Sequence, residues 1–495
     1  MVTFLAELND LELWGTDIGN AYLESYTEEK VAFVAGPEFG EFEGHLMIII
    51  KAQYGLKSSG QRWHDRFHDV LKSMGFTPSK AEDDIWMRDC GDHYEYIAVY
   101  VDDLLIASKN PQGIIDMLEG PQKFKLKGTG PVTYHLGCDY FRDETGTLCV
   151  GPRKYIERTA AQYETMFGEK PNLRVTSPLE KNDHPELDTT ALLDIDGIKQ
   201  YQSLIGILQW VITLGRFDIA TAVMTMSGFR VAPRVGHLDR LKRIVGYLVK
   251  MKHAFIRIRT EEPDYSGVTI PEYDWSRTVY GDTKEELPKD TPKALGKPVV
   301  FTTFVDANLY HDLLTGKAVT GVLHFMNQTL FDWYSKKQAS VETATYGSEF
   351  SAAKTAIQQI HAHRNTLRYL GVEVKGATYL WGDNESVVKS GSMPLSRLHK
   401  RHHGLSYHYV REAVASNTVH FNFIPGSINS ADIVSKHWAY SAVWPQLQSV
   451  LFWQGDTGTL LERDESSPES REGSKTIPVE SGENPNAKEG KEPQR

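Results

Sequence analysis

The chain has 495 residues, a formal net charge of −11 and 40% hydrophobic residues, which is enough apolar sequence for packed cores and suggests two to four domains. No apolar run approaches the ~18 residues that a membrane-spanning helix needs, no signal peptide is recognisable, and three cysteines cannot form a disulfide framework. We therefore expect an intracellular protein without membrane attachment, and the acidity argues against one that coats nucleic acid through bulk charge.

The first half of the chain mixes helix and strand patterns. Residues 62–74 have helical periodicity that ends at Gly75. Two β-rich runs, 96–101 and 104–107, flank a pair of aspartates, which predicts a hairpin with Asp102 and Asp103 at its tip. Further periodic segments predict two long helices, over 201–214 and 238–251.

A basic segment and a proline-rich segment follow. Residues 230–259 hold nine Lys and Arg against one Asp, a local charge of +8, which suits either a phosphate-facing surface or an ordinary solvated helix face. Residues 261–298 contain five prolines and an acidic run, which predicts a linker or a surface insertion.

The second half predicts an α/β layer. We expect strands over 299–305, 378–382 and 418–424, a strand meander over 320–334, a helix over 343–370 with Gly371 as its cap, and a late helix that starts at 429–432. Residues 462–495 are rich in charged and small residues, and we expect a disordered tail there.

Two sets of acidic residues carry possible chemistry. Carboxylates from separate elements bind hard divalent cations, and two such ions can activate a hydroxyl or water and stabilise a leaving oxygen. Taken singly, an Asp-Asp pair is also common turn chemistry, and an isolated acid is more often a surface residue or a helix cap. The first set is Asp17, Asp102 and Asp103, and the second is Asp306, Glu349, Asp383 and Asp432.

Ordered short motifs change these odds. Residues 17–22 (Asp-Ile-Gly-Asn-Ala-Tyr), 54–57 (Tyr-Gly-Leu-Lys) and 100–104 (Tyr-Val-Asp-Asp-Leu) resemble the palm motifs of copia-type retrotransposon reverse transcriptases. Downstream, 347–350 (Gly-Ser-Glu-Phe), 382–386 (Gly-Asp-Asn-Glu-Ser) and 431–436 (Ala-Asp-Ile-Val-Ser-Lys) resemble the ribonuclease H motifs of the same family.

The resemblance implies a role for each matched residue. All seven acids named above match catalytic, metal-binding carboxylates for Mg²⁺, with Mn²⁺ as the alternative ion, two ions per site. Tyr22 matches the bulky side chain that sterically excludes a ribose 2′-hydroxyl. Substrate contacts are also implied for Tyr100, Lys57 and His402. A zinc site at His399, His402 and His403 is the less favoured interpretation of that histidine cluster.

The implied fold class is α/β (α+β): a reverse transcriptase palm and thumb followed by a ribonuclease H-like mixed sheet. We expect a palm with partial fingers over 1–178, thumb or connection helices over 179–260, a linker or insertion over 261–298, a ribonuclease H-like domain over 299–461, and the tail. Only sixteen residues precede Asp17, where the family has a fingers segment that grips the incoming triphosphate. We therefore expect an N-terminally truncated polymerase half that exposes apolar surface.

The expected function is an RNA-directed DNA polymerase with ribonuclease H activity, and the chain is expected to cut RNA in a hybrid better than it extends a primer. Its partners would be an RNA template, a DNA primer, the RNA–DNA hybrid and dNTPs, in cytoplasmic particles or the nucleus. The alternatives are an inert retroelement remnant that only binds nucleic acid through residues 230–259, and a nuclease that uses only the second half.

Overall fold

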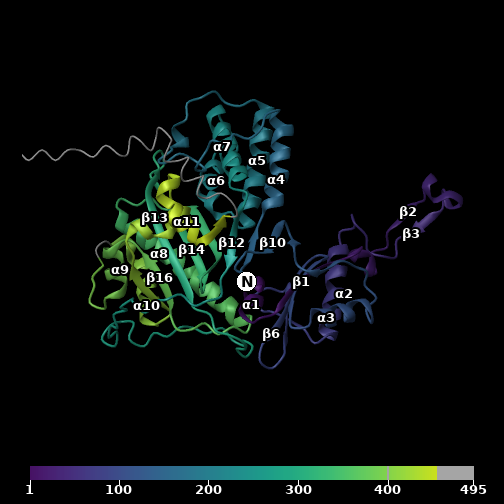
Figure 1. Ribbon diagram of the computed structural model, residues 1–495, viewed down its shortest axis with the longest axis horizontal. Helices are drawn as coiled ribbons and strands as arrows, with labels where there is room; N and C mark the ends of the chain where they lie inside the picture. The colour runs from purple at the N-terminus through teal and green to yellow at the C-terminus, as the bar shows by residue number, and fades with distance from the viewer. Residues whose placement is uncertain (399–400, 454–495) are drawn as a thin grey trace, which may run out of the picture. The chain divides into compact units, whose positions relative to one another are not determined.

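The computed structural model describes residues 1–398 and 401–453, which belong to one compact unit. The predicted tail and His399 lie outside the described residues. Helices and sheets alternate along the chain, so the mixed α/β architecture is confirmed (Figure 1). Within the described ranges, no helix combines the length and the hydropathy that crossing a bilayer would require.

The first sheet has six strands in the order β4-β5-β6-β7-β1-β8, and its β1 and β7 pair antiparallel. Alternate residues of its strands face two cores: Ile97 and Leu104 pack with helices α2 and α3, whereas Tyr96 and Leu105 pack with α1. The strands are β1 (Glu12–Ile18), β4 (Thr77–Pro78), β5 (Ile85–Asp89), β6 (Tyr94–Tyr100), β7 (Asp103–Ser108) and β8 (Leu126–Pro131); the helices are α1 (Val2–Leu8), α2 (Ser59–Ser73) and α3 (Pro111–Glu119).

The predicted hairpin exists, with its tip one residue earlier than expected. Tyr100 pairs with Asp103, so the two-residue turn consists of Val101 and Asp102, and Asp103 already belongs to β7. Val101 has φ +58°, a strained conformation for a β-branched residue that costs on the order of 1–3 kcal/mol. The predicted helix over 62–74 is α2, which begins three residues earlier and is followed by Gly75 at φ +84°.

A separate two-stranded ribbon carries exposed apolar side chains. Strands β2 (Ala32–Val34) and β3 (Leu46–Ile48) pair antiparallel, flanked by the 3₁₀ helices η1 (Ala21–Glu24) and η2 (Pro37–Phe42). Val34 is 66% exposed, Leu46 72% and Ile48 69%, so the ribbon presents apolar side chains to solvent.

A second sheet, in the order β18-β12-β11-β10-β9, joins the helical part of the chain. Both predicted long helices are present, as α5 and α7, and each begins earlier than expected; Asp194 caps α5 by accepting a hydrogen bond from the Gly197 N–H. The elements are β9 (Tyr134–His135), β10 (Cys138–Arg142), β11 (Leu148–Gly151), β12 (Ala254–Ile258), β18 (Leu451–Trp453), α4 (Arg153–Phe167), η3 (Pro185–Leu187), α5 (Ile195–Thr213), η4 (Phe217–Ile219), α6 (Ala220–Ser227) and α7 (Val235–Lys250).

The third sheet positions the second set of acids. Its order is β15-β14-β13-β16-β17; β13, β14 and β15 pair antiparallel, and β13–β16 and β16–β17 pair parallel. The elements are β13 (Phe301–Asp312), β14 (Lys317–Met326), β15 (Thr329–Lys337), α8 (Thr345–Tyr369), β16 (Thr378–Gly382), α9 (Glu385–Ser392), η5 (Arg401–His403), α10 (Gly404–Ala415), β17 (Val419–Phe423), η6 (Gly426–Ile428), η7 (Ser430–Val434) and α11 (Tyr440–Val450).

Two expectations for this sheet are wrong. Asp306 does not end its strand: β13 continues to Asp312 because β14 still pairs with it, and only the parallel partner β16 stops at Gly382. The late helix predicted to start at 429–432 is instead the short 3₁₀ helix η7. The reason is a tight local turn, in which the Asn429 side chain accepts a hydrogen bond from the Ala431 N–H. The predicted meander and the helix over 343–370 are confirmed as β14–β15 and α8.

Residues 261–298 form no helix or strand, yet they pack against the third sheet and α8. The Tyr265 ring lies 4.4 Å from that of Tyr379. Glu285 accepts hydrogen bonds from Arg364 and Arg368, which lowers its pKa to about 2 despite partial burial. The segment is therefore held by specific contacts.

Candidate functional site

The parallel pairing of β13 and β16 brings two acids together. Val305 of β13 is in register with Gly382 of β16. Asp306 and Asp383 each follow these residues directly, so they lie side by side. Asp306 is 1% exposed. Asn429 donates a hydrogen bond of 3.0 Å to the Val305 carbonyl, which fixes the following turn beside this point.

Asp432, from η7, completes a close group. One carboxylate oxygen from each of Asp306, Asp383 and Asp432 lies within 4.8 Å of the others. Glu349, from the first turns of α8, is outside this group but only 6% exposed, and its carboxylate interacts electrostatically with Asp306 and Asp383. All four predicted acids of the second set therefore converge.

Two residues just beyond η7 restrain the acids. Lys436 Nζ donates to Asp432 Oδ1 at 2.6 Å and to Asp306 Oδ1 at 3.2 Å. The Ser435 hydroxyl donates a short hydrogen bond to the other oxygen of Asp306. Sequence reasoning assigned no role to Lys436, although its spacing of four residues from Asp432 was a usable signal.

The pKa values of three of these acids are raised. Burial is the largest cause in each case, followed by repulsion from Asp306. The pKa of Glu349 lies well above its ordinary value, that of Asp383 is raised, and that of Asp432 rises to about 6. The same carboxylates raise the pKa of Lys436 although its burial opposes this. The site thus holds excess negative charge that one ammonium only partly offsets.

An all-oxygen donor set with repelling, desolvated carboxylates suits hard divalent cations better than zinc or copper. The residues present therefore fit Mg²⁺ or Mn²⁺.

The first set of acids meets at the end of the β6–β7 hairpin. Asp17 in β1 is in register with Asp103 in β7, so their side chains lie on the same face of the sheet. Asp102 is fixed from both sides of the turn: its carbonyl accepts the Ile18 N–H at 2.9 Å, and the Val101 carbonyl accepts the Trp63 indole N–H at 2.6 Å. The strained turn is thereby held in place.

This set is looser than the other. Among the described residues, Asp17, Asp102 and Asp103 are not one of the groups whose ligand atoms all lie within 4.8 Å. Burial, Asp102 and Asp17 together raise the pKa of Asp103. Lys127 of β8 is in register with Asp17, so a cation lies beside the acids. The sequence motifs did not indicate this cation.

Two aromatic rings adjoin these acids. Tyr22, in η1, packs against Tyr54 with ring centroids 4.6 Å apart. Burial, followed by Asp102, Tyr22 and Asp17, raises the pKa of Tyr54 although its side chain is 65% exposed. Tyr54 belongs to the Tyr-Gly-Leu-Lys motif, from which no role for it was predicted. In the structure it is close enough to Asp102 and Asp17 for their charges to act on it.

The other predicted substrate contacts are solvent-exposed. Tyr100, next to the turn, is 56% exposed, and Lys57 lies in the exposed loop before α2. His402 is exposed in η5, where ligand atoms of Glu342, His402 and His403 lie within 4.8 Å. The partner of the two histidines in this cluster is therefore an acid from the loop before α8.

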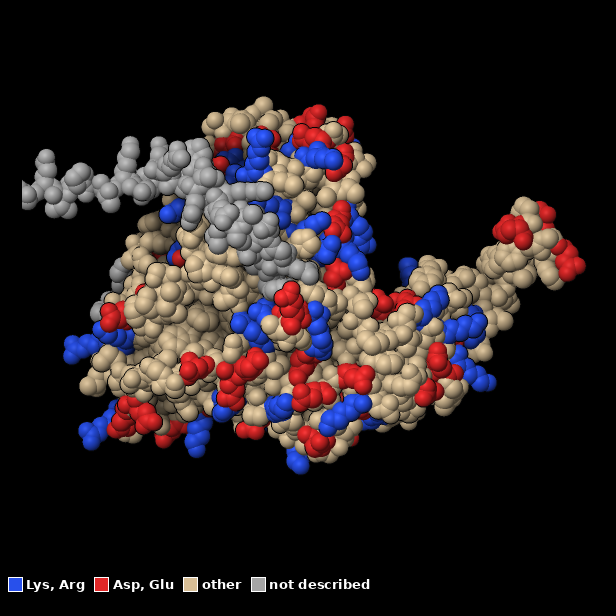
Figure 2. Space-filling view, in the orientation of Figure 1, with Lys and Arg blue, Asp and Glu red and all other residues tan. Residues whose placement is uncertain are grey.

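The basic segment 230–259 is largely neutralised. Five of its nine cations form ion pairs with acids from elsewhere in the chain, among them Arg240 with Asp183 and Asp188. On the face drawn in Figure 2, basic and acidic side chains are interspersed. The pairing weakens the case for this segment as a phosphate-binding surface.

Three comparisons with known proteins give similar chains. Residues 1–174 match the family described as reverse transcriptase (RNA-dependent DNA polymerase). The chain is 24% identical over 423 residues to the retrovirus-related Pol polyprotein from transposon RE1 of Arabidopsis thaliana, covering 85% of this chain and 26% of that protein. It is 25% identical over 443 residues to the Pol polyprotein from transposon TNT 1-94 of Nicotiana tabacum, covering 87% and 30%.

Residues 1–174 thus resemble a reverse transcriptase. Over 85% and 87% of its length, the chain is similar to the Pol polyproteins of these two transposons. It spans less than a third of the length of the two Pol polyproteins named above.

Solved structures with similar chains include a foamy viral protease-reverse transcriptase in complex with RNA/DNA hybrid, at 12% identity and a TM-score of 0.28 over 90% of this chain and 69% of that chain. LC11-RNase H1 in complex with RNA/DNA hybrid matches at 16% identity and a TM-score of 0.22 over 28% of this chain and 93% of that chain.

Proposed function

We propose that this chain is an RNA-directed DNA polymerase with an associated ribonuclease H that cuts the RNA strand of an RNA–DNA hybrid. The observation that carries the proposal is the convergence of Asp306, Asp383 and Asp432 within 4.8 Å around Lys436, with Glu349 beside them. A buried cluster of repelling acids destabilises the fold unless it serves to bind cations, which favours a catalytic site over a structural one.

The ribonuclease H acids would hold two Mg²⁺ or Mn²⁺ ions, which when bound supply a stronger nucleophile and stabilise the leaving oxygen of a phosphodiester. Asp306 and Asp383, fixed by strand register, set the position of the group. Ser435 and Lys436 orient Asp306 by hydrogen bonding. Lys436 opposes the rise in the pKa values of Glu349, Asp383 and Asp432, because an adjacent ammonium favours an ionised carboxylate.

The palm acids would perform the polymerase reaction. Asp17, Asp102 and Asp103 supply carboxylates at the end of the hairpin, and Trp63 holds the turn that carries them. Tyr22, supported by Tyr54, would pack under the deoxyribose and leave no space for a 2′-hydroxyl. Primer or template contacts by Tyr100, Lys57 and His402 belong to the same proposal.

We propose these domain limits: palm over 1–178, thumb or connection over 179–260, linker or insertion over 261–298, and ribonuclease H over 299–461.

An inert remnant that only binds nucleic acid is the second candidate function. Ion pairs engage five of the nine cations within 230–259, which weakens this candidate. The RNA template, DNA primer, hybrid and dNTPs are the proposed partners.

One reaction tests both halves. A labelled RNA template annealed to a labelled DNA primer is incubated with the chain, dNTPs and Mg²⁺, and gels report extension and RNA cleavage together. We expect Asp102→Asn to abolish extension alone and Asp383→Asn to abolish cleavage alone. The matched control is Asp116→Asn, an exposed acid on α3. If the folded wild-type chain binds hybrid without Mg²⁺ and shows neither reaction, the binding remnant is the correct interpretation.

A further inference from the structure

The turn between β5 and β6 places two metal-ligating side chains in a tight loop. Cys90 and His93 are separated by two residues, and the Cys90 N–H donates to the His93 carbonyl at 3.0 Å. Gly91 has φ +92°, and its N–H donates to the Asp89 carboxylate at 2.7 Å. Ligands two residues apart at such a turn are a spacing that zinc sites use.

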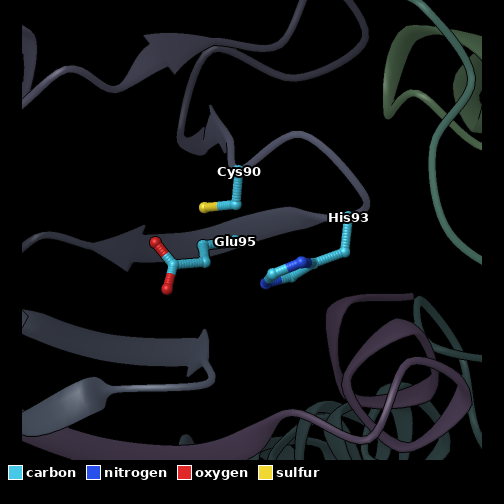
Figure 3. A group of neighbouring side chains, drawn as sticks. All are labelled: Cys90, His93 and Glu95. Atoms are coloured by element: carbon cyan, nitrogen blue, oxygen red, sulfur yellow. The ribbon is translucent and has the colours of Figure 1, made fainter.

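A third ligating side chain comes from β6. Ligand atoms of Cys90, His93 and Glu95 all lie within 4.8 Å of one another. Figure 3 shows the Cys90 thiol and the His93 ring both directed toward the Glu95 carboxylate. His93 is 7% exposed and Glu95 5% exposed, whereas Cys90 is exposed, so an ion could enter from the side of the thiol.

The imidazole of His93 is oriented as a metal ligand would be. Its Nδ1 lies 2.5 Å from the Asp92 carboxylate, which assigns the ring proton to Nδ1. Its Nε2 is buried and has no hydrogen-bond partner among the described residues. A carboxylate on one ring nitrogen and a free lone pair on the other is the arrangement by which proteins fix metal-ligating histidines.

Glu95 is held in position from the other side. Arg88 donates to Glu95 Oε2 through Nε at 3.0 Å and Nη2 at 2.6 Å, and Ser108 donates to Oε1 at 2.5 Å. These bonds lower the pKa of Glu95 against the effect of burial and leave further lone pairs on both oxygens. The carboxylate is thus ionised and fixed before any ion arrives.

We propose that Cys90, His93 and Glu95 bind one Zn²⁺ ion, with Asp92 as a positioning residue and a fourth position open to solvent. A sulfur, a nitrogen and an oxygen donor together select zinc over the hard ions proposed for the catalytic acids. Binding replaces the S–H bond of Cys90 with an S–Zn bond and releases the proton to solvent, so the thiolate and Glu95, which Arg88 also contacts, supply two negative charges to the ion. The ion would join strands β5 and β6 at the turn between them, which is the end of β6 opposite Asp102.

The test uses Co²⁺ as a spectroscopic probe. The metal-free full chain is titrated with Co²⁺ in excess Mg²⁺, and a thiolate-to-cobalt charge-transfer band with tetrahedral visible bands is expected to saturate at one equivalent and to disappear on adding Zn²⁺. Cys90→Ser and His93→Gln are expected to lose the band, Asp92→Asn to weaken Co²⁺ binding by about 10- to 100-fold, and Cys138→Ser to retain it. A band that survives Cys90→Ser, or its absence from folded wild-type protein, would overturn the proposal.

A second measurement needs no variant. The wild-type chain is alkylated with iodoacetamide in the presence of Zn²⁺ or of Mg²⁺, and the peptide that contains Cys90 is quantified by mass spectrometry. Protection of Cys90 by Zn²⁺ alone is expected. Equal labelling in both conditions would contradict the site, because a coordinated thiolate is not free to react.

Discussion

Replacing Asp432 with Asn should stabilise the metal-free chain while abolishing its ribonuclease H activity. The reason is that Asp432 lies among like charges in a largely buried site, where its ionised form is less favourable than in the unfolded chain. Burial and Asp306 raise its pKa from 3.8 to about 6 even though Lys436 opposes the shift.

The sign and size of the effect follow from proton linkage. The folded state binds this proton more tightly than the unfolded state, so the penalty is absent at low pH and grows as the pH rises from 3.8 to about 6. A shift of this size gives a gain in unfolding free energy for Asp432→Asn of about 1 kcal/mol near pH 4.5 and about 3 kcal/mol near pH 8.

The assay is urea denaturation in EDTA across this pH range, on the wild type, Asp432→Asn and the control Glu385→Gln. Glu385 is a nearby exposed acid with an exposed ion pair to Lys389, so its replacement should change the free energy of unfolding little at any pH. A stabilisation by Asp432→Asn that does not grow with pH, or a loss of stability at pH 8, would refute the electrostatic reasoning.

Three further outcomes are expected. Lys436→Met removes the ammonium that lowers the pKa of the neighbouring acids, so the pH profile of RNA cleavage should move to higher pH; an unmoved profile would exclude this role. Tyr22→Ala should raise the incorporation of ribonucleotides relative to deoxyribonucleotides, measured by primer extension, and unchanged selectivity would count against the steric role. Arg216→Met should destabilise the fold by about 3–5 kcal/mol in denaturant titrations, because it leaves Asp218 buried without its cation; a change under 1 kcal/mol would contradict this.

Sequence motifs predict the acids of both proposed sites, and the structure brings Asp306, Asp383 and Asp432 of the second set together. Asp306 and Asp383 can be paired from sequence because each follows a run of apolar and Thr residues. The parallel register of β13 and β16 puts those positions side by side, although β13 continues past Asp306. What the motifs cannot supply is the set of side chains that surrounds these acids. Lys436 and Ser435 matter through contacts made across the chain, and the local sequence does not encode such contacts.

Errors in the predicted elements have local physical causes. The hairpin tip was misplaced because a β-branched residue such as Val101 disfavours positive φ, and tertiary contacts from Trp63 override that preference. Strand β1 was missed because Trp14 and Gly15 break its alternation, although pairing on both sides makes it a central strand. The zinc-type cluster at Cys90 was missed because its third ligand becomes a neighbour only when β6 pairs with β5.

The most direct test of the account is cleavage of the RNA strand in a preformed RNA–DNA hybrid under single-turnover conditions. Wild type, Asp383→Asn and the exposed neighbour variant Glu385→Gln are compared with and without Mg²⁺. The account predicts Mg²⁺-dependent cleavage by wild type and Glu385→Gln, and none by Asp383→Asn although it remains folded. Cleavage that survives in Asp383→Asn, or a folded wild-type chain that never cuts the hybrid, would contradict it.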